Sequence, residues 1–321
     1  MGRGVKLALT LIISATAVCA RINAQAQDNL VLFWNLENFF DWTDGGNGDS
    51  DTEFTPGGKR HWTARKFYSK CNAVAKSVLW ISDEYGKLPD VIGLAEIENR
   101  GVLSKLINST SLRKTGYKIV HYDSPDHRGI DVALLWNTGT MDLISSKPCH
   151  IDGLETRDIL LVNLFDRRAQ KERAFIVVHL PSKFGGGKTA WKREKAAARL
   201  KAVADSVNAA GCSDITVMGD FNDTPDAEAF TQLKEVLVNV SEPLSAQGLG
   251  TIRFEGKWDL IDMFWVTPEM ARNVSMEIVR VPFLTVRDNV HSGIKPLRTY
   301  SGPRYLGGVS DHCPILLKYR L

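Results

Sequence analysis

The clearest structural signal in the sequence is the segment Asp90-Val91-Ile92-Gly93-Leu94-Ala95-Glu96. A short apolar run of this kind, bounded by polar residues, is typical of a buried β-strand. Glu96 stands at the carboxyl end of the run, and ligands of α/β proteins bind beyond the carboxyl ends of strands. The segment therefore predicts a buried strand that delivers a carboxylate to a cleft.

Four other short polar strings also follow apolar runs, and each carries a carboxylate, an amide or an imidazole. They are Asn35-Leu36-Glu37, His179, Gly219-Asp220-Phe221-Asn222 and Ser310-Asp311-His312. Strand ends of this kind point to one shared cleft, and the residue types are those that bind a divalent metal and a phosphate.

Strands and helices both occur along the chain. Strands are predicted at Leu30–Trp34, Tyr117–His121, Asp131–Trp136, Ile159–Phe165, Ala174–Leu180, Ile215–Met218 and Pro314–Leu317, and helices at Trp62–Asp83 and Trp191–Ala210. Many of these strands follow one another without room for a helix, so an all-parallel sheet is not expected. We predict an α/β fold with mixed sheets and helices on the outside.

Residues 1–26 have the layout of a secretory signal peptide: two basic residues, an apolar stretch from Leu7 to Val18, and then small residues. Cleavage after Ala20 or Ala26 fits the pattern, and we prefer Ala26. Lipid anchoring through Cys19 is not expected, because Val18 stands where such signals have a small residue. We therefore expect an exported protein, periplasmic or secreted.

The mature chain, residues 27–321, is predicted to be one domain, because no linker or change of composition divides it. Removing the leader lowers the count of basic residues from 40 to 37, against 37 acidic residues. A neutral chain gives no global sign of a nucleic-acid partner. We expect a monomer with no membrane-spanning segment.

Four cysteines remain after the leader, namely Cys71, Cys149, Cys212 and Cys313. Disulfides are permitted in an exported protein, but none of these residues has C-x-x-C spacing and the chain is too large to need them. Free thiols are the preferred interpretation.

Hydrolysis of a phosphate ester requires a cation on the phosphoryl oxygens, a positioned water and hydrogen-bond donors for the developing charge. Glu96 is the best candidate metal ligand, because Mg²⁺ prefers carboxylate and amide oxygens. Asp220 can take or orient the proton of a water. Alternate residues of an extended segment point to the same side, so Asp220 and Asn222 can contact one ligand. The amide of Asn222 can donate to a phosphate oxygen.

Two imidazoles are candidates for contacts with phosphate. His312 follows Asp311, which offers a metal or orienting carboxylate, and His179 ends an apolar strand. A structural histidine explains His179 equally well from its sequence context. Lys183 and Arg193 belong to a basic segment that could hold phosphate, although a solvated helix face is the commoner explanation.

A Gly-rich loop carries Asp41, Asp44, Asp49 and Asp51, which raises the question of a Ca²⁺ site. The spacing of an EF-hand with its distal glutamate is not met. We therefore expect a solvated loop near the rim of the cleft.

Taken together and in order, the five strings resemble the endonuclease/exonuclease/phosphatase superfamily, which includes deoxyribonucleases, abasic-site endonucleases, sphingomyelinases and inositol-polyphosphate phosphatases. The resemblance extends from Asn35 to His312. It implies a four-layer α/β sandwich of two mixed sheets, with helices outside and a Mg²⁺ site at one rim.

The resemblance also implies roles for single residues. Asn35 and Glu96 look like the first-strand amide and the metal carboxylate, with Asn35 also near the phosphate. Asp220 looks like the residue that orients water, with Asn222 beside it, and His179 and His312 look like the two imidazoles at the phosphate.

The resemblance implies further roles. Asp262 is similar to an aspartate that steadies an active-site imidazole, with Asp259 as its competitor, and Asp311 looks like a metal or imidazole-orienting carboxylate. Glu37 is either a further metal carboxylate or a strand-end charge. Arg128 and Asp131 stand where members of the family place phosphate-contacting residues, and Lys183 and Arg193 of the basic segment complete the phosphate-binding candidates.

We therefore expect an exported phosphodiesterase that depends on Mg²⁺ or Mn²⁺ and acts as an endonuclease on nucleic acid. The alternative substrate is a small or lipid phosphate of the inositol phosphate or sphingomyelin type. A binding protein without turnover is less favoured, because the full set of polar strings is present.

Overall fold

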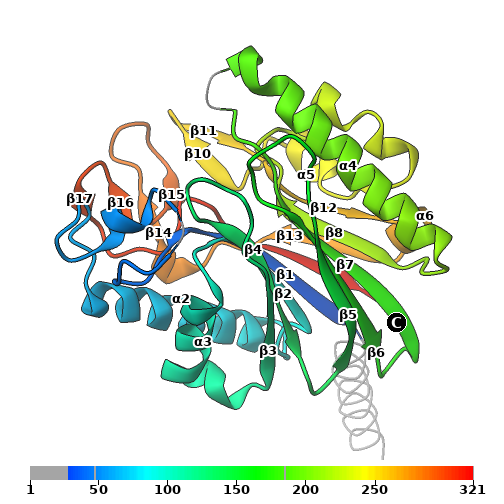
Figure 1. The fold of residues 1–321 in the computed structure, drawn as a ribbon, viewed down its shortest axis with the longest axis horizontal. Helices are drawn as coiled ribbons and strands as arrows, with labels where there is room; N and C mark the ends of the chain where they lie inside the picture. Colours follow the sequence, from blue (N-terminus) through cyan, green and yellow to red (C-terminus); the bar gives the residue numbers. More distant parts are fainter. Residues whose placement is uncertain (1–27, 47, 184–185, 321) are drawn as a thin grey trace, which may run out of the picture.

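The computed structural model describes residues 28–46, 48–183 and 186–320. Two six-stranded sheets lie face to face, and helices cover their outer faces (Figure 1). The expected α/β sandwich of two mixed sheets is therefore confirmed.

The first sheet has the strand order β13-β18-β1-β2-β4-β3 and the second has the order β5-β6-β7-β8-β12-β9. The strands of the first sheet are β1 (Asn29–Phe39), β2 (Val91–Ile97), β3 (Tyr117–His121), β4 (Asp131–Asn137), β13 (Val274–Ile278) and β18 (Ile315–Tyr319). Those of the second are β5 (Met141–Cys149), β6 (Ile159–Asp166), β7 (Lys171–His179), β8 (Ile215–Asp220), β9 (Val238–Asn239) and β12 (Asp262–Val266).

The α-helices of the described residues are α2 (Ala64–Glu84), α3 (Arg100–Ser109), α4 (Ala190–Ala209), α5 (Glu242–Ala246) and α6 (Pro268–Ala271). Three small hairpins are formed by β10 (Ile252–Phe254) with β11 (Lys257–Asp259), β14 (Thr285–Arg287) with β15 (Ile294–Pro296), and β16 (Tyr300–Ser301) with β17 (Arg304–Tyr305). The short 3₁₀ helix η1 (Asp51–Phe54) lies in the loop after β1.

Each sheet contains one parallel pair of strands near its middle, and its other pairs are antiparallel. In the first sheet β1 runs parallel to β2, and in the second β7 runs parallel to β8. The carboxyl ends of a parallel pair lie at the same edge of a sheet. This arrangement explains how four distant polar strings reach one rim of the molecule.

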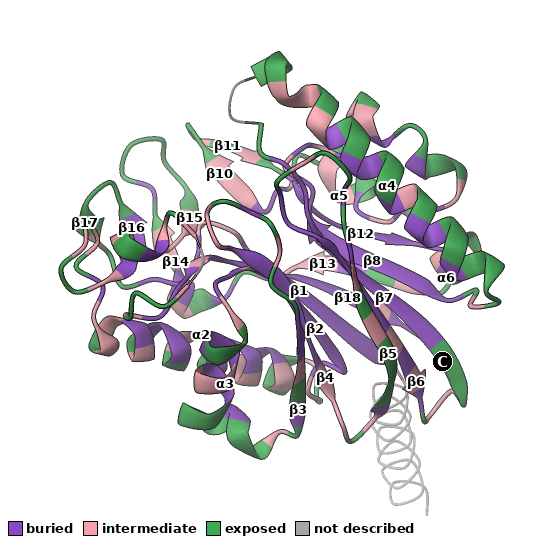
Figure 2. Cartoon of the chain, viewed as in Figure 1, coloured by how far each residue is buried: buried purple, intermediate pink, exposed green. Residues whose placement is uncertain are grey.

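The apolar side chains form three layers of core. One lies between the two sheets, and the other two lie between each sheet and its helices. In β1, Val31 and Phe33 face the other sheet, while Leu32 and Trp34 face the helix side. Figure 2 shows the buried residues concentrated in the central strands and the exposed ones on the outer helices.

The two long helices follow their predicted positions within a few residues. Thr63 precedes α2, and its side chain accepts a hydrogen bond from the backbone N–H of Lys66, which fixes the start of the helix. Two elements are not apparent from the sequence, namely β5, whose central residues are exposed, and the ten-residue helix α3. Both have too little apolar periodicity or length to stand out.

All four cysteines described are free thiols, as preferred from the sequence, and only Cys212 is partly exposed. The proposed signal peptide lies outside the described residues. Within them, none of the helices combines the length and the apolar character needed to span a membrane.

Candidate active site

Neighbouring strand ends in the second sheet place three of the candidate residues side by side. His179 ends β7 and pairs in register with Asp220, which ends β8. Asp262 begins β12, which runs antiparallel to β8, and it pairs with Asp220 on the other side. His312 comes to the same rim because it precedes β18, which runs antiparallel to β1.

Asp220 is at the centre of this group. Its Oδ2 atom accepts a hydrogen bond of 3.0 Å from the amide of Asn35 in the facing sheet. The same oxygen lies 3.6 Å from Nε2 of His179 and 3.8 Å from Nε2 of His312. Burial raises the pKa of Asp220 to about 7, against the lowering effect of His312. Its carboxyl group can therefore take up a proton near neutral pH.

Asp262 orients His312. Its Oδ2 lies 2.8 Å from Nδ1 of the imidazole. Burial alone lowers the pKa of His312, but the Asp262 carboxylate, with smaller contributions from Asp220 and Asp311, outweighs burial and holds the pKa well above its usual range. The competing Asp259 is exposed at the end of β11. The geometry thus gives the orienting contact to Asp262.

His179 has the opposite electrostatic character. Burial, with a smaller contribution from the Arg157 guanidinium, lowers its pKa well below the usual range, so the ring is neutral. Its Nδ1 atom is buried and has no hydrogen-bond partner among the described residues. Arg157 donates to the carbonyls of His179 and Leu180 at 3.1 and 2.7 Å, which fixes the end of β7.

Four residues near the site adopt left-handed backbone conformations that side chains other than glycine rarely take. They are Glu37, Asn38, Glu96 and Asn222, with φ between 46° and 60°. Strained residues of this type persist where the surrounding structure holds them, and they are concentrated at functional sites. The backbone therefore supports a site at this rim independently of the side-chain chemistry.

A second group of carboxylates lies on the side of the first sheet. Arg298 bridges Glu37 and Asp311, with Nη2–oxygen distances of 2.8 and 3.0 Å. Burial, followed by repulsion from Asp311, raises the pKa of Glu37 to about 7. Glu96 accepts a 2.6 Å hydrogen bond from the backbone N–H of Asn38. The group therefore brings three carboxylates to the rim, two of them paired with Arg298.

Lys70 supports this group from the helix side. Its Nζ donates to the carbonyl oxygen of Glu37 at 2.6 Å and to Thr299 Oγ1 at 2.9 Å, and burial lowers its pKa to about 8. Sequence reasoning missed this residue, although Lys70 stands on the apolar stripe of α2, three residues after Phe67 and four before Val74. A lysine on the core-facing stripe of a helix indicates a buried polar contact, because lysine is rarely buried unless it is paired. Arg157 and Arg298 had no such signal.

The donor set of this rim fits a hard divalent cation. Glu37, Glu96 and Asp311 supply carboxylate oxygens, the ligand type that Mg²⁺ and Mn²⁺ favour. Asp220, Asp262 and His312 also place ligand atoms within 4.8 Å of one another. Candidate acidic metal-binding groups are therefore present.

The structure changes the interpretation of two amides. Asn222 does not continue an extended segment beyond Asp220, because its φ is 51°; its backbone N–H donates to Asp220 Oδ1 and its amide donates to the Leu180 carbonyl. Asn35 uses its Oδ1 to accept from the backbone N–H of Glu37. In these contacts both residues position their neighbours.

The structure separates three of the phosphate-binding candidates from the central group. Lys183 and Arg193 both pair with Asp223, and the Arg193 guanidinium is buried there. Asp131 is a buried carboxylate that accepts from Ser124 and lies 3.3 Å from His121 Nε2. A buried carboxylate repels phosphate, so the geometry argues against this role for Asp131.

Arg128 remains in a position that fits phosphate. Its guanidinium donates to Asn38 Oδ1 at 2.7 Å and lies 3.8 Å from Glu96 Oε2. It is partly exposed and reaches the rim from the loop before β4.

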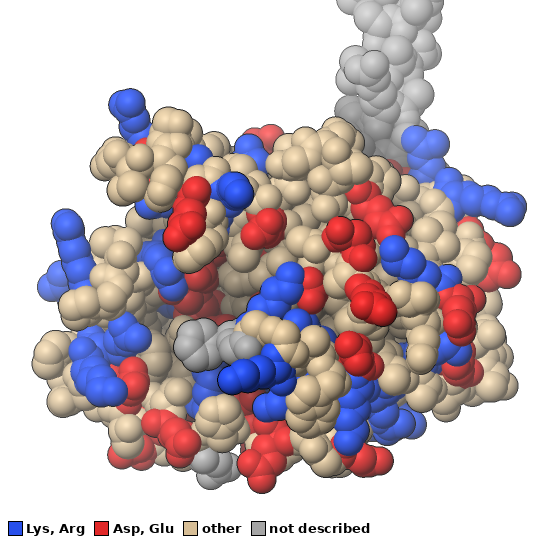
Figure 3. Space-filling model, turned by 90° about the horizontal axis from the view of Figure 1, so that it is seen from above, with Lys and Arg blue, Asp and Glu red and all other residues tan. Residues whose placement is uncertain are grey.

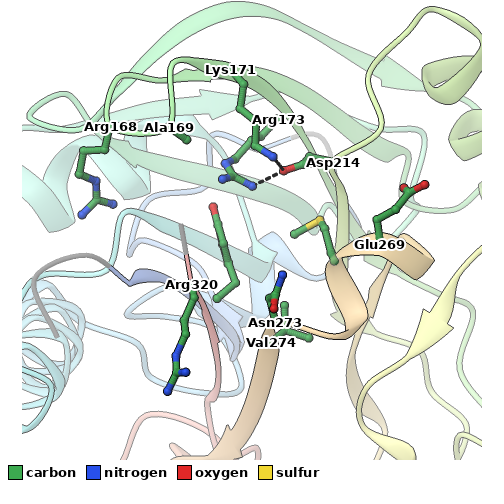
Figure 4. A pocket seen from close by; sticks show the side chains of 11 residues that line it. Arg168, Ala169, Lys171, Arg173, Asp214, Glu269, Asn273, Val274 and Arg320 are labelled. Atoms are coloured by element: carbon green, nitrogen blue, oxygen red, sulfur yellow. Dashed lines mark hydrogen bonds and ion pairs between the residues drawn. The ribbon is translucent and has the colours of Figure 1, made fainter. Parts of the chain in front are cut away.

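A separate hollow of about 500 Å³ lies at the opposite end of the sheets, beside the amino ends of β7 and β8 (Figure 4). It contains several basic side chains, but Lys171 and Arg173 both pair with Asp214. None of the candidate residues lines it. It is therefore not part of the site described above.

Comparisons with known proteins agree with this geometry. The sequence profile described as "Endonuclease/Exonuclease/phosphatase family" matches residues 30–320. A search of curated protein sequences found no match.

Several solved structures have the same fold. An endonuclease/exonuclease/phosphatase family protein from Bacteroides thetaiotaomicron is 14% identical, with a TM-score of 0.59, 91% of this chain covered and 97% of that one. A mannosyl-6-phosphatase from the same organism is 14% identical, with a TM-score of 0.58 and coverages of 90% and 98%. The D. rerio TDP2 complexed with a single-strand DNA product is 14% identical, with a TM-score of 0.57 and coverages of 92% and 99%.

The profile match spans almost the whole of the described chain, and the fold and the acidic rim agree with it. The chain belongs to the endonuclease/exonuclease/phosphatase family, whose members are hydrolases of phosphate ester bonds.

Proposed function

We propose that the protein is an exported phosphodiesterase that depends on Mg²⁺ and cleaves nucleic acid internally. The observation that carries the proposal is the position of Asp220 between two imidazoles, with its Oδ2 at 3.6 Å from His179 and 3.8 Å from His312. A base flanked by two donors is what in-line attack of water on phosphorus requires.

Asp220 acts as the base in this proposal. The amide of Asn35 and the backbone N–H of Asn222 each donate to one of its two oxygens, so its orientation is fixed. A water held by Asp220 gives up its proton to the carboxylate as its oxygen attacks phosphorus, and the bond from phosphorus to the leaving oxygen breaks on the opposite side. The leaving oxygen takes a proton from solvent. With a pKa of about 7, the carboxylate is a stronger base than an exposed aspartate.

The two imidazoles stabilise charge on the phosphoryl oxygens. His312 is protonated because Asp262 holds its pKa high, and it donates a charge-assisted hydrogen bond. His179 is neutral and can donate from Nε2 without adding charge. Arg128 lies within reach of the same rim and binds a phosphate flanking the scissile bond.

Glu96, with Glu37 and Asp311, is proposed to hold the metal. When bound there, the cation neutralises the phosphoryl oxygens. Arg298 pairs with Glu37 and Asp311 and adds a second positive group near the phosphate.

A small or lipid phosphate is the second candidate substrate. Figure 3 shows acidic and basic side chains interspersed on the displayed face, without one continuous basic surface of the kind that tracks a nucleic-acid backbone. Structural neighbours of both kinds exist, since one is named a mannosyl-6-phosphatase and another contains a DNA product.

The proposed function is tested by substituting Asp220→Asn in the purified mature chain. Substrates are plasmid DNA, RNA, a sugar phosphate, an inositol phosphate and sphingomyelin vesicles, each with Mg²⁺, Mn²⁺ or EDTA. We expect nucleic-acid cleavage with Mg²⁺ and a loss on the order of 10²- to 10⁴-fold in the variant.

Asp259→Asn is the matched control, because it makes the same chemical change at an exposed position close to the site. It should retain the wild-type rate. Cleavage of the small or lipid phosphates alone would contradict the nucleic-acid substrate and favour the second substrate class. Near-normal activity of Asp220→Asn on every substrate would exclude the assigned base.

A further inference from the structure

Three buried carboxylates lie together outside the candidate active site. Asp41, Asp51 and Glu98 are only 3%, 1% and 6% exposed. Lys105 pairs with Asp41 at 2.5 Å, but no described cationic side chain forms an ion pair with Asp51 or Glu98. Buried carboxylates without an ion pair are costly, so Asp51 and Glu98 require either protons or a cation. The sequence-based expectation of a solvated loop is wrong for Asp41 and Asp51.

Asp51 carries the clearest sign of a missing partner. Its Oδ2 accepts hydrogen bonds from the backbone N–H groups of Gly45 and Gly46, at 2.8 and 2.6 Å. Its Oδ1 is fully buried and has no hydrogen-bond partner among the described residues. Native proteins rarely leave a buried carboxylate oxygen unpaired.

Glu98 lies on the other side of Gly46 from Asp51 Oδ2. Its Oε2 accepts from the backbone N–H of Asp41 at 2.7 Å. A Cβ atom on Gly46 would lie 3.1 Å from Asp51 Oδ2 and 3.2 Å from Glu98 Oε1, so a glycine keeps the gap between the two carboxylates open. Gly45, Gly46 and Glu98 also line a cleft of about 540 Å³, which gives an ion and its waters a way in.

We propose that Asp51 and Glu98 bind a calcium ion. The side-chain ligands are oxygens only, with no histidine or cysteine among them, which favours a hard cation over zinc or copper. Calcium is favoured over magnesium because it accepts irregular sets of carboxylates, loop carbonyls and waters. No described hydrogen bond or ion pair links Asp51 or Glu98 with the side chains of the candidate active site, so this is a separate site.

The site is placed to order the loop that carries Arg128. The backbone N–H of Asp49 donates to the carbonyl of His127 at 2.8 Å. A Cβ atom on Gly48 would lie 2.2 Å from the backbone nitrogen of Gly129, so these two backbones touch. Calcium bound by Asp51 therefore fixes the loop on which Arg128 rests.

The test measures calcium binding by isothermal titration calorimetry, with magnesium present throughout at a saturating concentration. We expect one calcium ion per wild-type chain, with a dissociation constant of about 1 mM or tighter. Asp51→Asn and Glu98→Gln should each weaken binding at least about 10-fold, because each removes one anionic ligand. Calcium should also raise the melting temperature of the wild type and leave that of Asp51→Asn unchanged.

Asp49→Asn is the matched control, since it removes the same charge from an exposed position of the same loop. It should bind calcium within about twofold of wild type. Glu96→Gln separates the two metal sites and should keep the calcium response. If Asp51→Asn does not fold, as judged by circular dichroism, the calcium affinity of Glu98→Gln is used instead.

Two results would overturn the proposal. One is wild-type protein that shows neither heat of calcium binding nor thermal stabilisation, which would mean that the carboxylates share protons. The other is calcium binding of unchanged affinity in both Asp51→Asn and Glu98→Gln. Neither result bears on Asp220 or on the hydrolysis of phosphate esters.

Discussion

At the scale of single residues, the rim combines a base and an acid whose pKa values are both raised. Burial raises the pKa of Asp220 to about 7, and Asp262 holds that of His312 well above its usual range. The proposed mechanism needs Asp220 ionised and His312 protonated. Activity should therefore rise as the pH increases through the pKa of Asp220 and fall as it passes that of His312.

The substitution Asp262→Asn tests this arrangement. It removes the carboxylate that holds the His312 pKa high, so the alkaline limb of the pH–rate profile should move to lower pH. An NMR titration of the His312 ring should show a lowered pKa. Asp259→Asn should leave both measurements unchanged. An unaltered His312 pKa in Asp262→Asn would contradict the assigned pair.

The pair of His312 and Asp262 also makes the free energy of unfolding depend on pH. The folded-state pKa of His312 is raised, so its contribution to the free energy of unfolding is fully present below the unfolded pKa of about 6.5. That contribution is lost as the pH rises through the folded-state pKa. The stability difference between wild type and Asp262→Asn should therefore be larger at pH 6 than at high pH.

At the scale of elements, the parallel pair β7–β8 determines where His179 and Asp220 stand. Gly219 pairs in register with Val178, one residue before the functional pair. A Cβ atom on Gly219 would lie 2.2 Å from the Val178 carbonyl oxygen. The close spacing of the two backbones therefore depends on this glycine.

Gly219→Ala should push β8 away from β7 and displace Asp220. We expect a loss of stability of about 1–3 kcal/mol, the usual range for overpacking, together with a lower kcat. Urea denaturation and steady-state kinetics measure the two effects.

Gly93→Ala is a suitable control, because its new methyl group would meet the flexible side chain of Met218 rather than backbone. It should affect kcat less. Equal kinetic effects of the two substitutions would show that the spacing of β7 and β8 does not position the base.

At the scale of the whole molecule, the layer of side chains between the sheets connects the two halves of the site. Phe33 and Val91 of the first sheet belong to the same buried cluster as Phe175 and Phe264 of the second. Asn35 and Asp220 come from different sheets and meet at its edge. The geometry of the site therefore depends on how the two sheets pack.

Phe175→Ala should lower the free energy of unfolding by about 3–5 kcal/mol, because it leaves a cavity between the sheets. Tryptophan fluorescence and far-ultraviolet circular dichroism in urea should report one shared transition, as predicted for a single domain. Phe254→Ala, at a 68% exposed position, should change stability by less than about 0.5 kcal/mol. Two separate transitions would indicate that the sheets unfold independently.

Local sequence patterns were sufficient for eight strands of the two large sheets, the two long helices and the polar strings at strand ends. The segment Val91–Ile97 illustrates the reason, because burial on both faces of a central strand leaves an uninterrupted apolar run. The chemistry of Glu96, Asp220 and His312 was equally visible, since it depends on residue type and on position relative to a strand.

Only the tertiary structure determined which residues distant in the chain contact one another. Arg298 meets Glu37 across 261 residues, and the uncompensated carboxylates of Asp51 and Glu98 come together only when the loop after β1 packs against the end of β2. Burial and pairing depend on which surfaces meet, and no short window of sequence contains that information. Local periodicity therefore determined the elements, whereas the packing of the two sheets determined the electrostatics of the rim.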